Sequence, residues 1–551
     1  METRLLKNPY TIDKMGTSGL RLTQEDYNRD GFLEQFIQGI AEYFLEISDE
    51  DTLARKKRTL LLGGDPRKGN RERIRIAASI LAGNGFEVIE ARDGLASTPA
   101  MSHGIRELSV LGGIIFTASH NPFTDVGIKV NMSNGAPALA DTVDKIHMLQ
   151  NAVSEYRFSE YESARESGAV TDIDIVALYG DLLDSIFDFA DMKNKISKSR
   201  IKGLFDAMNG AAGPFAHDIF IDRLGLDCRI MREEPREDLG GYDEKGEPMH
   251  PEPDFDYVPD LITENSTGKY AVVAAWDSDV DRRLDGGSGF FLESADEFAL
   301  FSRYSHLINI DALFDSTIYF CRSTVTAGPT DLMREELSAK YPGKAVETVE
   351  TPTGFKWIAE LGNWGVEESN GVGNPYLREK DGIFSTVFLL KILLESGKKP
   401  KELMEELWAE YGRVYFARGE VSGSDPEEQK QLEQILRDGW SKKGKTFGTL
   451  TLEDATSWDY THPVTGTVAA KDAAYVLSFS DGNTVKARFS GTGSGGYTLR
   501  VYCLKYDRIF NMPKSAIVQP MKDAFDSFLA DGGFSKKSRK YSDTHQPEIY
   551  V

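Results

Sequence analysis

The strongest constraint on the fold of this chain is a short apolar run that stops abruptly at polar residues. Residues 114–116 (Ile-Ile-Phe) predict a buried β-strand, and the polar stretch 117–121 follows directly. Open α/β sheets place their chemistry beyond the carboxyl ends of their strands, so Ser119 in this turn is a candidate nucleophile. The same residues also suit an ordinary polar turn, and this stretch alone does not separate the two interpretations.

The segments around this turn show the alternation of strands, turns and helices that is typical of βαβ units. A strand at 59–62 runs into a glycine turn, and a helix near 70–83 leads to a second strand at 87–90. A helix near 99–108 then leads into the strand before Ser119. Apolar residues at helical spacing predict further helices, over about 30–48, 143–153 and 175–189. We expect residues 1–195 to form a first α/β domain.

Length, charge and cysteine usage limit the class of protein. With 551 residues the chain exceeds one hydrophobic core, so about three to five domains are expected. Its formal net charge of −23 argues against nucleic acid or an anionic membrane as a partner. No signal peptide or transmembrane helix is expected, because no apolar run is long enough. Three widely spaced cysteines, Cys228, Cys321 and Cys503, favour reduced thiols in a cytoplasmic protein.

An expected second α/β domain, 196–305, contains a carboxylate triplet. An apolar strand at 270–276 delivers Asp277, Asp279 and Asp281 at alternate positions, close enough to converge on one cation. Oxygen ligands favour Mg²⁺ or Ca²⁺ over zinc. An EF-hand is excluded, because Arg282 and Ser288 replace its glycine and its bidentate glutamate. A solvated acidic turn is the alternative, although such turns seldom follow directly on an apolar strand.

The expected third α/β domain, 306–408, offers residues suited to a polyol. Glu367 and Ser369 combine a carboxylate with a hydroxyl, and a carboxylate accepts hydrogen bonds from two neighbouring sugar hydroxyls at once. The turn at 352–356 contains Thr353 and Gly354. Lys380 lies between two acids and is either a proton donor or part of a surface ion pair. The alternative for the acidic loop is a solvated surface turn.

The last segment, 409–551, changes to antiparallel β patterning and predicts an α+β domain. Strands are expected at 474–479, 484–488 and 497–502, with 481–483 as a hairpin turn. The loop 488–496 satisfies the pattern Gly-x-Gly-x-x-Gly, but a strand rather than a helix follows it, which excludes a dinucleotide site. Its glycines and hydroxyls, together with Arg488 and Arg500, favour a phosphate cradle over a plain glycine hairpin.

These motifs together resemble those of the α-D-phosphohexomutase superfamily, and within it the phosphoglucomutases most. The matching stretches occur in the family's order and span nearly the whole chain: 16–21, 117–122, 277–282, 367–369, 378–382 and 488–493. The resemblance implies three similar mixed α/β domains plus a C-terminal α+β domain, heart-shaped around a central active-site cleft. It implies interconversion of glucose 1-phosphate and glucose 6-phosphate through a phosphoserine enzyme. Glucose 1,6-bisphosphate would be the intermediate and activator.

The resemblance also implies roles for individual residues. Ser119 would be the phosphoserine and, with Asp277, Asp279 and Asp281, would hold one Mg²⁺ per chain. Lys129 matches the general acid/base position. Supporting catalytic positions are matched by Arg21, His120 and Lys380. Phosphosugar-binding positions are assigned to Arg282, Arg283, Thr353, Gly354, Glu367, Ser369, Arg488, Ser490, Gly491, Thr492, Gly493 and Arg500.

Two departures from the family's pattern affect what is expected. Ser278 and Val280 stand where the vertebrate-like members of the family commonly have glycine, and the segment 122–126 looks shorter than theirs. The alternatives are a different sugar preference, as in a phosphomannomutase or a glucose 1,6-bisphosphate synthase, and a non-catalytic scaffold of the same fold. A monomer or a weak homo-oligomer is expected.

Overall fold

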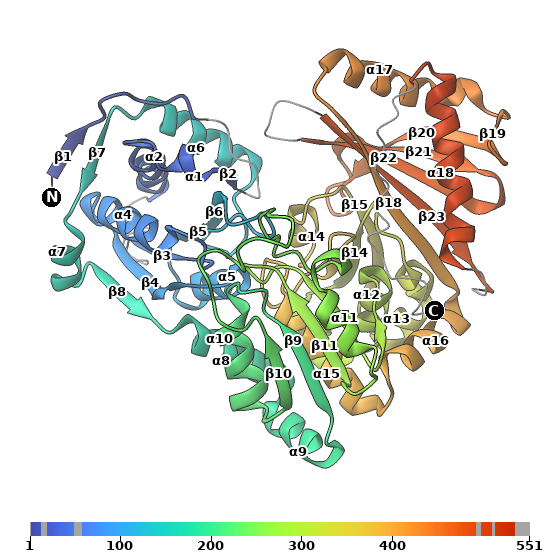
Figure 1. Cartoon of the computed structure of the whole chain (residues 1–551), viewed down its shortest axis with the longest axis horizontal. Helices are drawn as coiled ribbons and strands as arrows, with labels where there is room; N and C mark the ends of the chain where they lie inside the picture. The colour runs from blue at the N-terminus through green and yellow to red at the C-terminus, as the bar shows by residue number, and fades with distance from the viewer. Residues whose placement is uncertain (1, 13–18, 49–57, 492–496, 510–512, 535–551) are drawn as a thin grey trace. The chain divides into compact units, whose positions relative to one another are not determined.

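The chain folds into two compact units. Unit 1 comprises Met1–Pro253, Tyr257–Gly289 and Asn370–Gly397, and unit 2 comprises Asp254–Asp256, Phe290–Ser369 and Lys398–Val551. The computed structural model describes all residues except 1, 13–18, 49–57, 492–496, 510–512 and 535–551 (Figure 1). The division into four domains at 1–195, 196–305, 306–408 and 409–551 stays a prediction.

The first sheet of unit 1 has the strand order β2-β6-β5-β3-β4-β8 (Figure 1). Strands β5, β3, β4 and β8 are parallel, whereas β6 and β2 form an antiparallel edge. β3 and β5 are buried along their whole length, as expected for strands covered on both faces. The strands are β2 (Leu20–Thr23), β3 (Thr59–Gly64), β4 (Glu87–Leu95), β5 (Gly112–Phe116), β6 (Asp125–Met132) and β8 (Val170–Ile173).

Helices cover both faces of this sheet. α2 (Phe32–Ile47), α4 (Asn70–Gly83) and α6 (Ala140–Ala152) share one apolar core with Leu60 and Leu62 of β3. On the opposite face, α5 (Thr98–Glu107) and α8 (Ile175–Phe187) lie against Leu61 of β3. Leu61 lies between Leu60 and Leu62 in sequence, and successive side chains of a strand point to opposite faces. The remaining elements here are β1 (Glu2–Leu5), paired with β7 (Glu155–Phe158), α1 (Gln24–Tyr27), α7 (Tyr161–Glu166) and α9 (Phe189–Ser199).

The second sheet of unit 1 contains the strand order β10-β9-β11-β12. β9 is parallel to both β10 and β11, and β12 returns antiparallel to β11. Helix α15 packs on it through Trp276, whose Nε1 donates to Thr386 Oγ1 at 3.1 Å. The elements of this part of unit 1 are β9 (Lys202–Asp206), α10 (Ala212–Ala216), a π-helix (His217–Arg223), β10 (Asp227–Met231), α11 (Pro259–Asn265), β11 (Val272–Trp276), β12 (Arg283–Gly287) and α15 (Gly382–Ser396). The short strand β17 (Gly371–Val372) also lies in unit 1 but is not a strand of this sheet.

The two sheets of unit 1 use the same device to present a polar loop. In each, a buried parallel strand ends, a short loop turns the chain, and an antiparallel strand returns. Residues 117–124 connect β5 to β6, and residues 277–282 connect β11 to β12. The first turn closes tightly because Gly127 approaches Thr117, where a Cβ would lie 2.2 Å from the Thr117 carbonyl oxygen.

Unit 2 begins with a parallel sheet in the order β15-β14-β16. Its strands are β14 (Thr317–Ser323), β15 (Ala345–Thr351) and β16 (Gly365–Glu367). The short strand β13 (Phe290–Phe291) precedes them. The α-helices are α12 (Ser294–Arg303), α13 (Arg334–Lys340), α14 (Lys356–Glu360) and α16 (Pro400–Tyr411).

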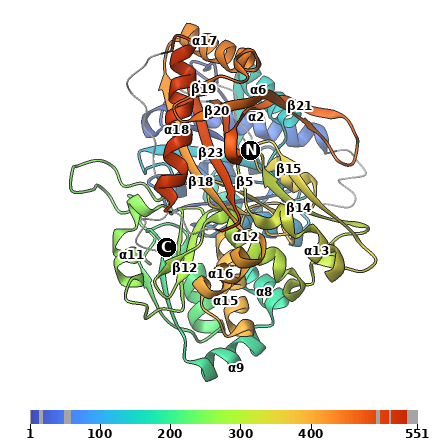
Figure 2. The same cartoon turned by 90° about the vertical axis from the view of Figure 1, so that its right-hand side faces the viewer.

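The C-terminal part of unit 2 is an antiparallel sheet in the order β18-β23-β22-β21-β20-β19 (Figures 1 and 2). Helix α18 packs on one face, where Val485 and Leu499 belong to the same core as Phe525. The glycine loop leads into a strand rather than a helix, which confirms that it is not a dinucleotide fingerprint. The elements are β18 (Arg413–Gly423), α17 (Pro426–Arg437), β19 (Thr446–Phe447), β20 (Leu450–Thr461), β21 (Val468–Phe479), β22 (Asn483–Gly491), β23 (Tyr497–Asp507) and α18 (Lys514–Asp531).

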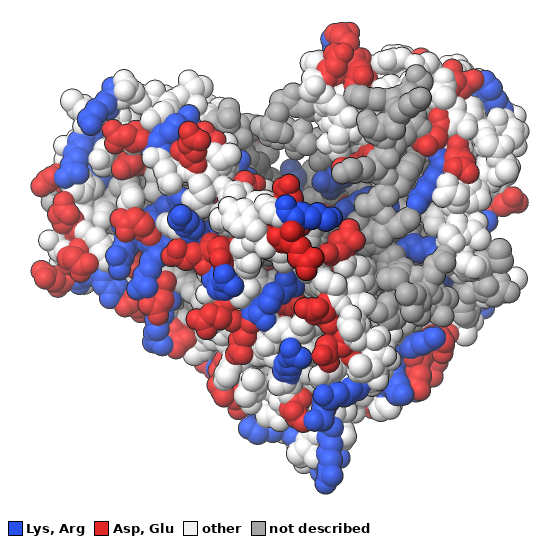
Figure 3. Space-filling view, in the orientation of Figure 1, with Lys and Arg blue, Asp and Glu red and all other residues white. Residues whose placement is uncertain are grey.

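The described surface mixes both signs of charge. Figure 3 shows acidic and basic side chains interspersed on one face of the molecule. Several form exposed ion pairs, such as Arg71 with Asp93 at 3.1 Å, and such pairs contribute little to stability. Among the described residues, no helix is both long and apolar enough to cross a membrane.

The close approach of α2 and α6 gives a stability test. A Cβ added at Gly39 would lie 2.5 Å from Gln150 Cγ and 2.6 Å from its Cα. Helix propensity alone favours Gly39→Ala by about 1 kcal/mol, but overpacking costs about 1–3 kcal/mol. We expect the variant to lower the free energy of unfolding, measured by urea denaturation. Glu46→Ala, at an exposed position of α2, should change it by less than about 0.5 kcal/mol. Stabilisation by Gly39→Ala would contradict the packing.

Candidate active site

Ser119 lies in the first residues after β5, where the sequence places the candidate nucleophile. It adopts a left-handed conformation, with φ of 53°, which is uncommon for a residue other than glycine. Its backbone N–H donates to Thr117 Oγ1 at 2.8 Å, which fixes the turn. The side chain is buried, and its Oγ donates to Asp277 Oδ2 at 2.8 Å. The hydroxyl therefore points at the predicted metal loop.

Asp277, Asp279 and Asp281 form a compact, buried carboxylate cluster after β11. One oxygen from each lies within 4.8 Å of the others. Burial, followed by repulsion from Asp279 and Asp281, raises the pKa of Asp277 well above its usual value. The Oδ1 atoms of Asp279 and Asp281 are buried and accept no hydrogen bond from the described residues. An oxygen-only set with unused buried acceptors fits a hard divalent cation such as Mg²⁺.

Two lysines compensate this negative charge. Lys129 Nζ, from β6, lies 2.7 Å from Asp279 Oδ2 and 3.3 Å from Asp281 Oδ2. Burial acts to lower the pKa of Lys129, but these two carboxylates raise it above its usual value, so the side chain carries a charge. Lys380 Nζ lies 3.3 Å from Asp281 Oδ2. The structure thus brings both predicted lysines to the carboxylate cluster, while their catalytic roles stay predictions.

His120, Arg21 and Arg282 complete the surroundings of Ser119. His120 Nδ1 lies 3.4 Å from Ser119 Oγ. Burial and the positive charges of Arg282 and Arg21 lower the pKa of His120 well below its usual value, which favours a neutral imidazole. Arg21 donates to Asn121 Oδ1 at 3.0 Å, and Arg282 Nη1 lies 3.5 Å from Glu252. These cations suit an anionic substrate.

The predicted sugar-binding residues lie together in unit 2. The Gly354 N–H donates to Glu367 Oε1 at 2.7 Å, so the turn after β15 is joined to the end of β16. Gly354 has a φ of 118°, which other residues rarely adopt. Thr353 Oγ1 is buried and makes no hydrogen bond to the described residues. Ser369 is half-buried in the loop after β16.

The predicted phosphate-binding arginines are direct neighbours in the C-terminal sheet. Arg488 of β22 is paired with Arg500 of β23, so both side chains project from the same face. Glu368 is buried beside them, 3.8 Å from Arg488 and accepting from the Tyr502 hydroxyl at 3.1 Å. Burial acts to raise the pKa of Glu368, but Arg488, its own loop amide, Arg418 and Arg500 lower it. The Nε atoms of Arg488 and Arg500 are buried and without a hydrogen-bond acceptor among the described residues, so they fit an added anion.

Some predicted site residues are not placed in these clusters. Arg283 is buried in β12, with its Nε 3.5 Å from Asp285 Oδ2, and its role in substrate binding stays a prediction. Ser490 and Gly491 continue the β22–β23 pairing through their backbones. Thr492, Gly493 and the start of the first motif, 16–18, lie outside the described residues.

Other residues join the sites without having been predicted. Thr98, the first residue of α5, donates from its hydroxyl to Asp279 Oδ2 at 2.8 Å. Glu368 and Arg418 belong to the arginine cluster, which the sequence assigned only to Arg488 and Arg500. Arg418 lies on the edge strand β18, where the pairing register aligns it with Tyr502. The local sequence pattern does not determine this register, so it could not assign Arg418 to the cluster.

Three family models of known protein domains match this chain. The model of phosphoglucomutase/phosphomannomutase α/β/α domain I matches residues 13–157, and that of domain III matches 325–411. The model of the phosphoglucomutase-1 C-terminal domain matches 413–530. Three separate parts of the chain therefore match the phosphohexomutases.

The similar proteins point to the phosphoglucomutases within the phosphohexomutases. Phosphoglucomutase 1 of Drosophila melanogaster is 33% identical over 538 residues, covering 91% of each chain. Human phosphoglucomutase-1 is 32% identical over 536 residues, with 91% of each chain covered. The open form of parafusin, a phosphoglucomutase and exocytosis-sensitive phosphoprotein from Paramecium, superposes with a TM-score of 0.81 at 29% identity, covering 98% of this chain and 99% of that one. The chain belongs to the phosphoglucomutase family, whose members are isomerases.

The carboxylate cluster leads to a metal-binding test. Asp279→Asn keeps the side-chain shape but removes one charge from the three ligands. We expect the affinity for Mn²⁺, used as a probe in titration calorimetry, to fall by at least about tenfold. Even mutations of residues that only support the metal ligands commonly reduce metal affinity by this factor. Asp243→Asn, on an exposed loop of the same unit, is the control. Equal affinity of Asp279→Asn and wild type would rule out this cluster as the metal site.

Proposed function

We propose that this chain is a phosphoglucomutase that interconverts glucose 1-phosphate and glucose 6-phosphate. The observation that carries the proposal is the Ser119 hydroxyl, 2.8 Å from Asp277 in a buried set of three carboxylates. A phosphorylated serine beside a hard-cation site is suited to phosphoryl transfer rather than acyl transfer. The names of the relatives support the choice of glucose.

In the proposed reaction, phosphorylated Ser119 donates its phosphoryl group to O6 of glucose 1-phosphate. The bond from phosphorus to Ser119 Oγ breaks and a bond to O6 forms. The proton lost from O6 is balanced by one that Ser119 Oγ takes up as it becomes a hydroxyl. The product is glucose 1,6-bisphosphate, which reorients and returns its 1-phosphoryl group to Ser119. Glucose 6-phosphate then leaves, and the phosphoenzyme is restored.

Each part of unit 1 has a proposed task. Asp277, Asp279 and Asp281 would hold one Mg²⁺, which when bound neutralises phosphoryl charge and polarises the transferring group. We assign proton exchange at the sugar hydroxyl to Lys129, which is a donor in its charged form and would become an acceptor once a bound Mg²⁺ neutralised Asp279 and Asp281 and its own proton was lost. Arg21, His120, Lys380 and Arg282 would orient the phosphoryl oxygens and stabilise the charge of the transition state.

Unit 2 would bind the rest of the substrate. We assign the sugar hydroxyls to Glu367 and Ser369, with Thr353 and Gly354 beside them. Arg488 and Arg500 would bind the phosphate that is not being transferred, because bidentate guanidinium groups suit phosphate oxygens. The predicted contribution of Ser490, Gly491, Thr492 and Gly493 is a set of backbone N–H donors.

The finer properties remain part of this proposal. A different sugar, as in a phosphomannomutase or a glucose 1,6-bisphosphate synthase, is the alternative within enzymes. A non-catalytic scaffold is the alternative outside them. The cytoplasmic location, a monomer or weak homo-oligomer, and the absence of nucleic-acid or membrane partners stay predictions. Relatives from Marchantia polymorpha, Solanum tuberosum and Arabidopsis thaliana are named as chloroplastic phosphoglucomutases.

The nucleophile is tested with Ser119→Ala. We expect kcat to fall about 1,000-fold or more, because the phosphoryl carrier is lost. Intact-mass analysis after incubation with glucose 1,6-bisphosphate should show one added phosphoryl group on wild type and none on the variant. Ser102→Ala removes another buried hydroxyl of unit 1 and should leave both results unchanged. Normal turnover by Ser119→Ala would exclude the mechanism, and an inactive wild type with Mg²⁺ and bisphosphate would favour the scaffold.

Substrate choice is tested by comparing kcat/KM for glucose 1-phosphate and mannose 1-phosphate. We expect glucose to be preferred by about tenfold or more, because a buried polar group left without its hydroxyl partner is penalised. Glu367→Gln should reduce this preference, whereas Glu360→Gln, at the exposed end of α14, should not. A preference for mannose would overturn the assignment to glucose while leaving the class of reaction intact.

A further inference from the structure

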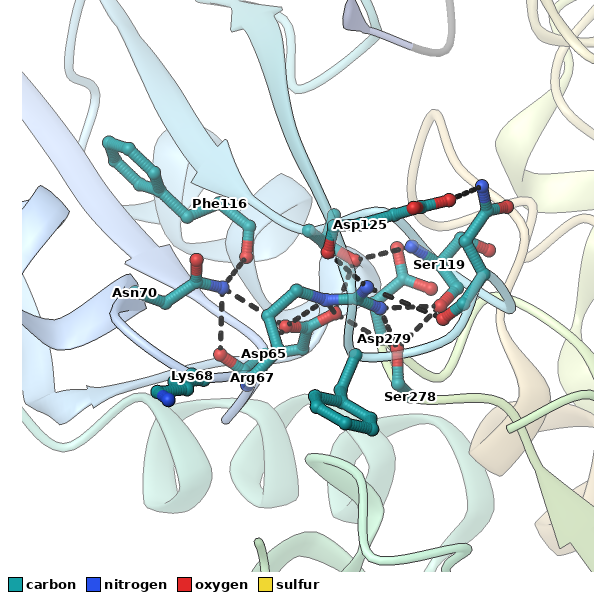
Figure 4. A network of polar contacts seen from close by, with 12 residues as sticks. Asp65, Arg67, Lys68, Asn70, Phe116, Ser119, Asp125, Ser278 and Asp279 are labelled. Carbon is teal, nitrogen blue, oxygen red and sulfur yellow. Dashed lines mark hydrogen bonds and ion pairs between the residues drawn. The ribbon is translucent and has the colours of Figure 1, made fainter. Parts of the chain in front are cut away.

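The side chain of Arg67 is fully buried at the end of β3, in the turn that leads to α4. Its Nε lies 2.9 Å and 3.0 Å from the two carboxylate oxygens of Asp65 (Figure 4). Asp65 in turn accepts from Thr117 Oγ1 at 2.7 Å and from Asn70 Nδ2 at 3.0 Å. The guanidinium is therefore anchored to the end of β5, immediately before Ser119.

The other two nitrogens of Arg67 bind the Ser119 loop. Nη1 donates to the carbonyl oxygens of Asn121, Pro122 and Asp125, at 3.3, 3.0 and 2.9 Å. Nη2 donates to the carbonyl oxygen of Ser119 at 2.7 Å. One buried cation thus collects four carbonyl oxygens along the loop that carries the candidate nucleophile.

Ser278 joins this loop to the carboxylate loop. It lies between Asp277 and Asp279 in sequence, and its Oγ lies 2.7 Å from the Ser119 carbonyl oxygen. The same hydroxyl is 2.9 Å from Asp65 Oδ2 and accepts from Arg67 Nη2 at 3.1 Å. A single side chain therefore contacts the nucleophile loop, the anchoring carboxylate and the guanidinium (Figure 4).

This arrangement differs from a buried ion pair that serves stability alone. A pair of that kind needs only its two partners and contributes little net stabilisation. Here the remaining donors of Arg67 go to the loop of Ser119 and to Ser278 of the carboxylate loop. A glycine at position 278 would have no hydroxyl to make these contacts. The backbone of Ser278 is not in the left-handed region, whereas that of Val280 is, with a φ of 68°.

We propose that Arg67 and Ser278 are positioning residues that hold the Ser119 loop in register with the Asp277–Asp281 loop. They fix the Ser119 carbonyl, and thereby the direction in which the Oγ points at Asp277. Neither residue contacts the transferring group in this assignment. The kinetic part of the inference rests on the proposed function, whereas the ordering of the loop depends only on contacts within this chain.

The test uses Arg67→Lys and Ser278→Ala in the full-length chain. Lysine keeps the charge but lacks the planar fork, so it cannot reach the same set of acceptors. Arg232→Lys is the matched control, because Arg232 forks onto the buried Asp206 and lies outside the Ser119 loop. Ser102→Ala is the control for loss of a buried hydroxyl.

Two readouts separate positioning from stability. Hydrogen–deuterium exchange of the peptide covering 117–125 should rise about tenfold or more in Arg67→Lys and rise less in Ser278→Ala, with no change in either control. With glucose 1-phosphate, kcat should fall about 100-fold in Arg67→Lys, because small misplacements of a reacting group are that costly. KM should stay within about threefold, because the residues assigned to sugar binding are not altered.

The outcomes distinguish this inference from the proposed function. If wild type lacks mutase activity but the loop exchanges faster in both variants, the positioning role stands and the proposed function fails. If wild type is active and both variants keep its kcat and its exchange in 117–125, the positioning role is overturned. Should Arg67→Lys fail to fold, Ser278→Ala and Ser278→Gly decide by the same two readouts. A lower melting temperature with unchanged exchange and kcat also counts against the inference.

Discussion

The constraint on which unit 1 depends is the burial of three carboxylates at one point. Placing like charges together away from water is costly, so the fold must supply cations or hold a proton. Lys129 arrives from β6 and Lys380 from the segment before α15, and both reach the cluster. Despite burial, these lysines lower the pKa values of Asp279 and Asp281, whereas burial and repulsion from these two carboxylates raise the pKa of Asp277. A divalent cation would relieve the remaining repulsion, which links the local electrostatics to the proposed chemistry.

The fold places the nucleophile and the cation site by one repeated construction. A parallel strand that is buried on both faces consists mainly of apolar residues, so polar side chains first occur in the loop after the strand. In both sheets of unit 1 the chain then returns antiparallel, which keeps the loop short. The short loop after β5 forces Ser119 into a left-handed backbone, and that after β11 does the same to Val280. Ser119 is itself the candidate nucleophile, and Val280 lies between Asp279 and Asp281, so both strained residues belong to the candidate site, a common place for such strain.

Local signals in the sequence predicted much of this arrangement. The helix expected near 70–83 is α4, Asn70–Gly83, and the hairpin expected around 481–483 joins β21 to β22. The carboxylate spacing and the strand before it predicted the cluster. The contacts of Arg67 with Ser278 could not be predicted, because 211 positions separate them and only the tertiary fold brings them together. The sequence assigned Arg282 and Arg283 together, and only the structure separates them, because Arg282 lies in the loop and Arg283 is buried in β12 beside Asp285. The role of Arg283 stays a prediction.

Unit 2 applies the same electrostatic principle with the opposite sign. Arg418, Arg488 and Arg500 all lower the pKa of one buried carboxylate, Glu368. Glu367 also acts on Arg488, but two negative charges do not balance three guanidinium groups. The buried Nε atoms of Arg488 and Arg500 have no hydrogen-bond acceptor among the described residues. An excess of positive charge with unused donors favours a dianion such as a phosphate monoester. Unit 1 favours a divalent cation for the complementary reason, because its carboxylates have unused acceptors. A phosphate monoester therefore suits the arginines of unit 2, whereas the carboxylates of unit 1 would repel an anion unless a metal cation were bound between them.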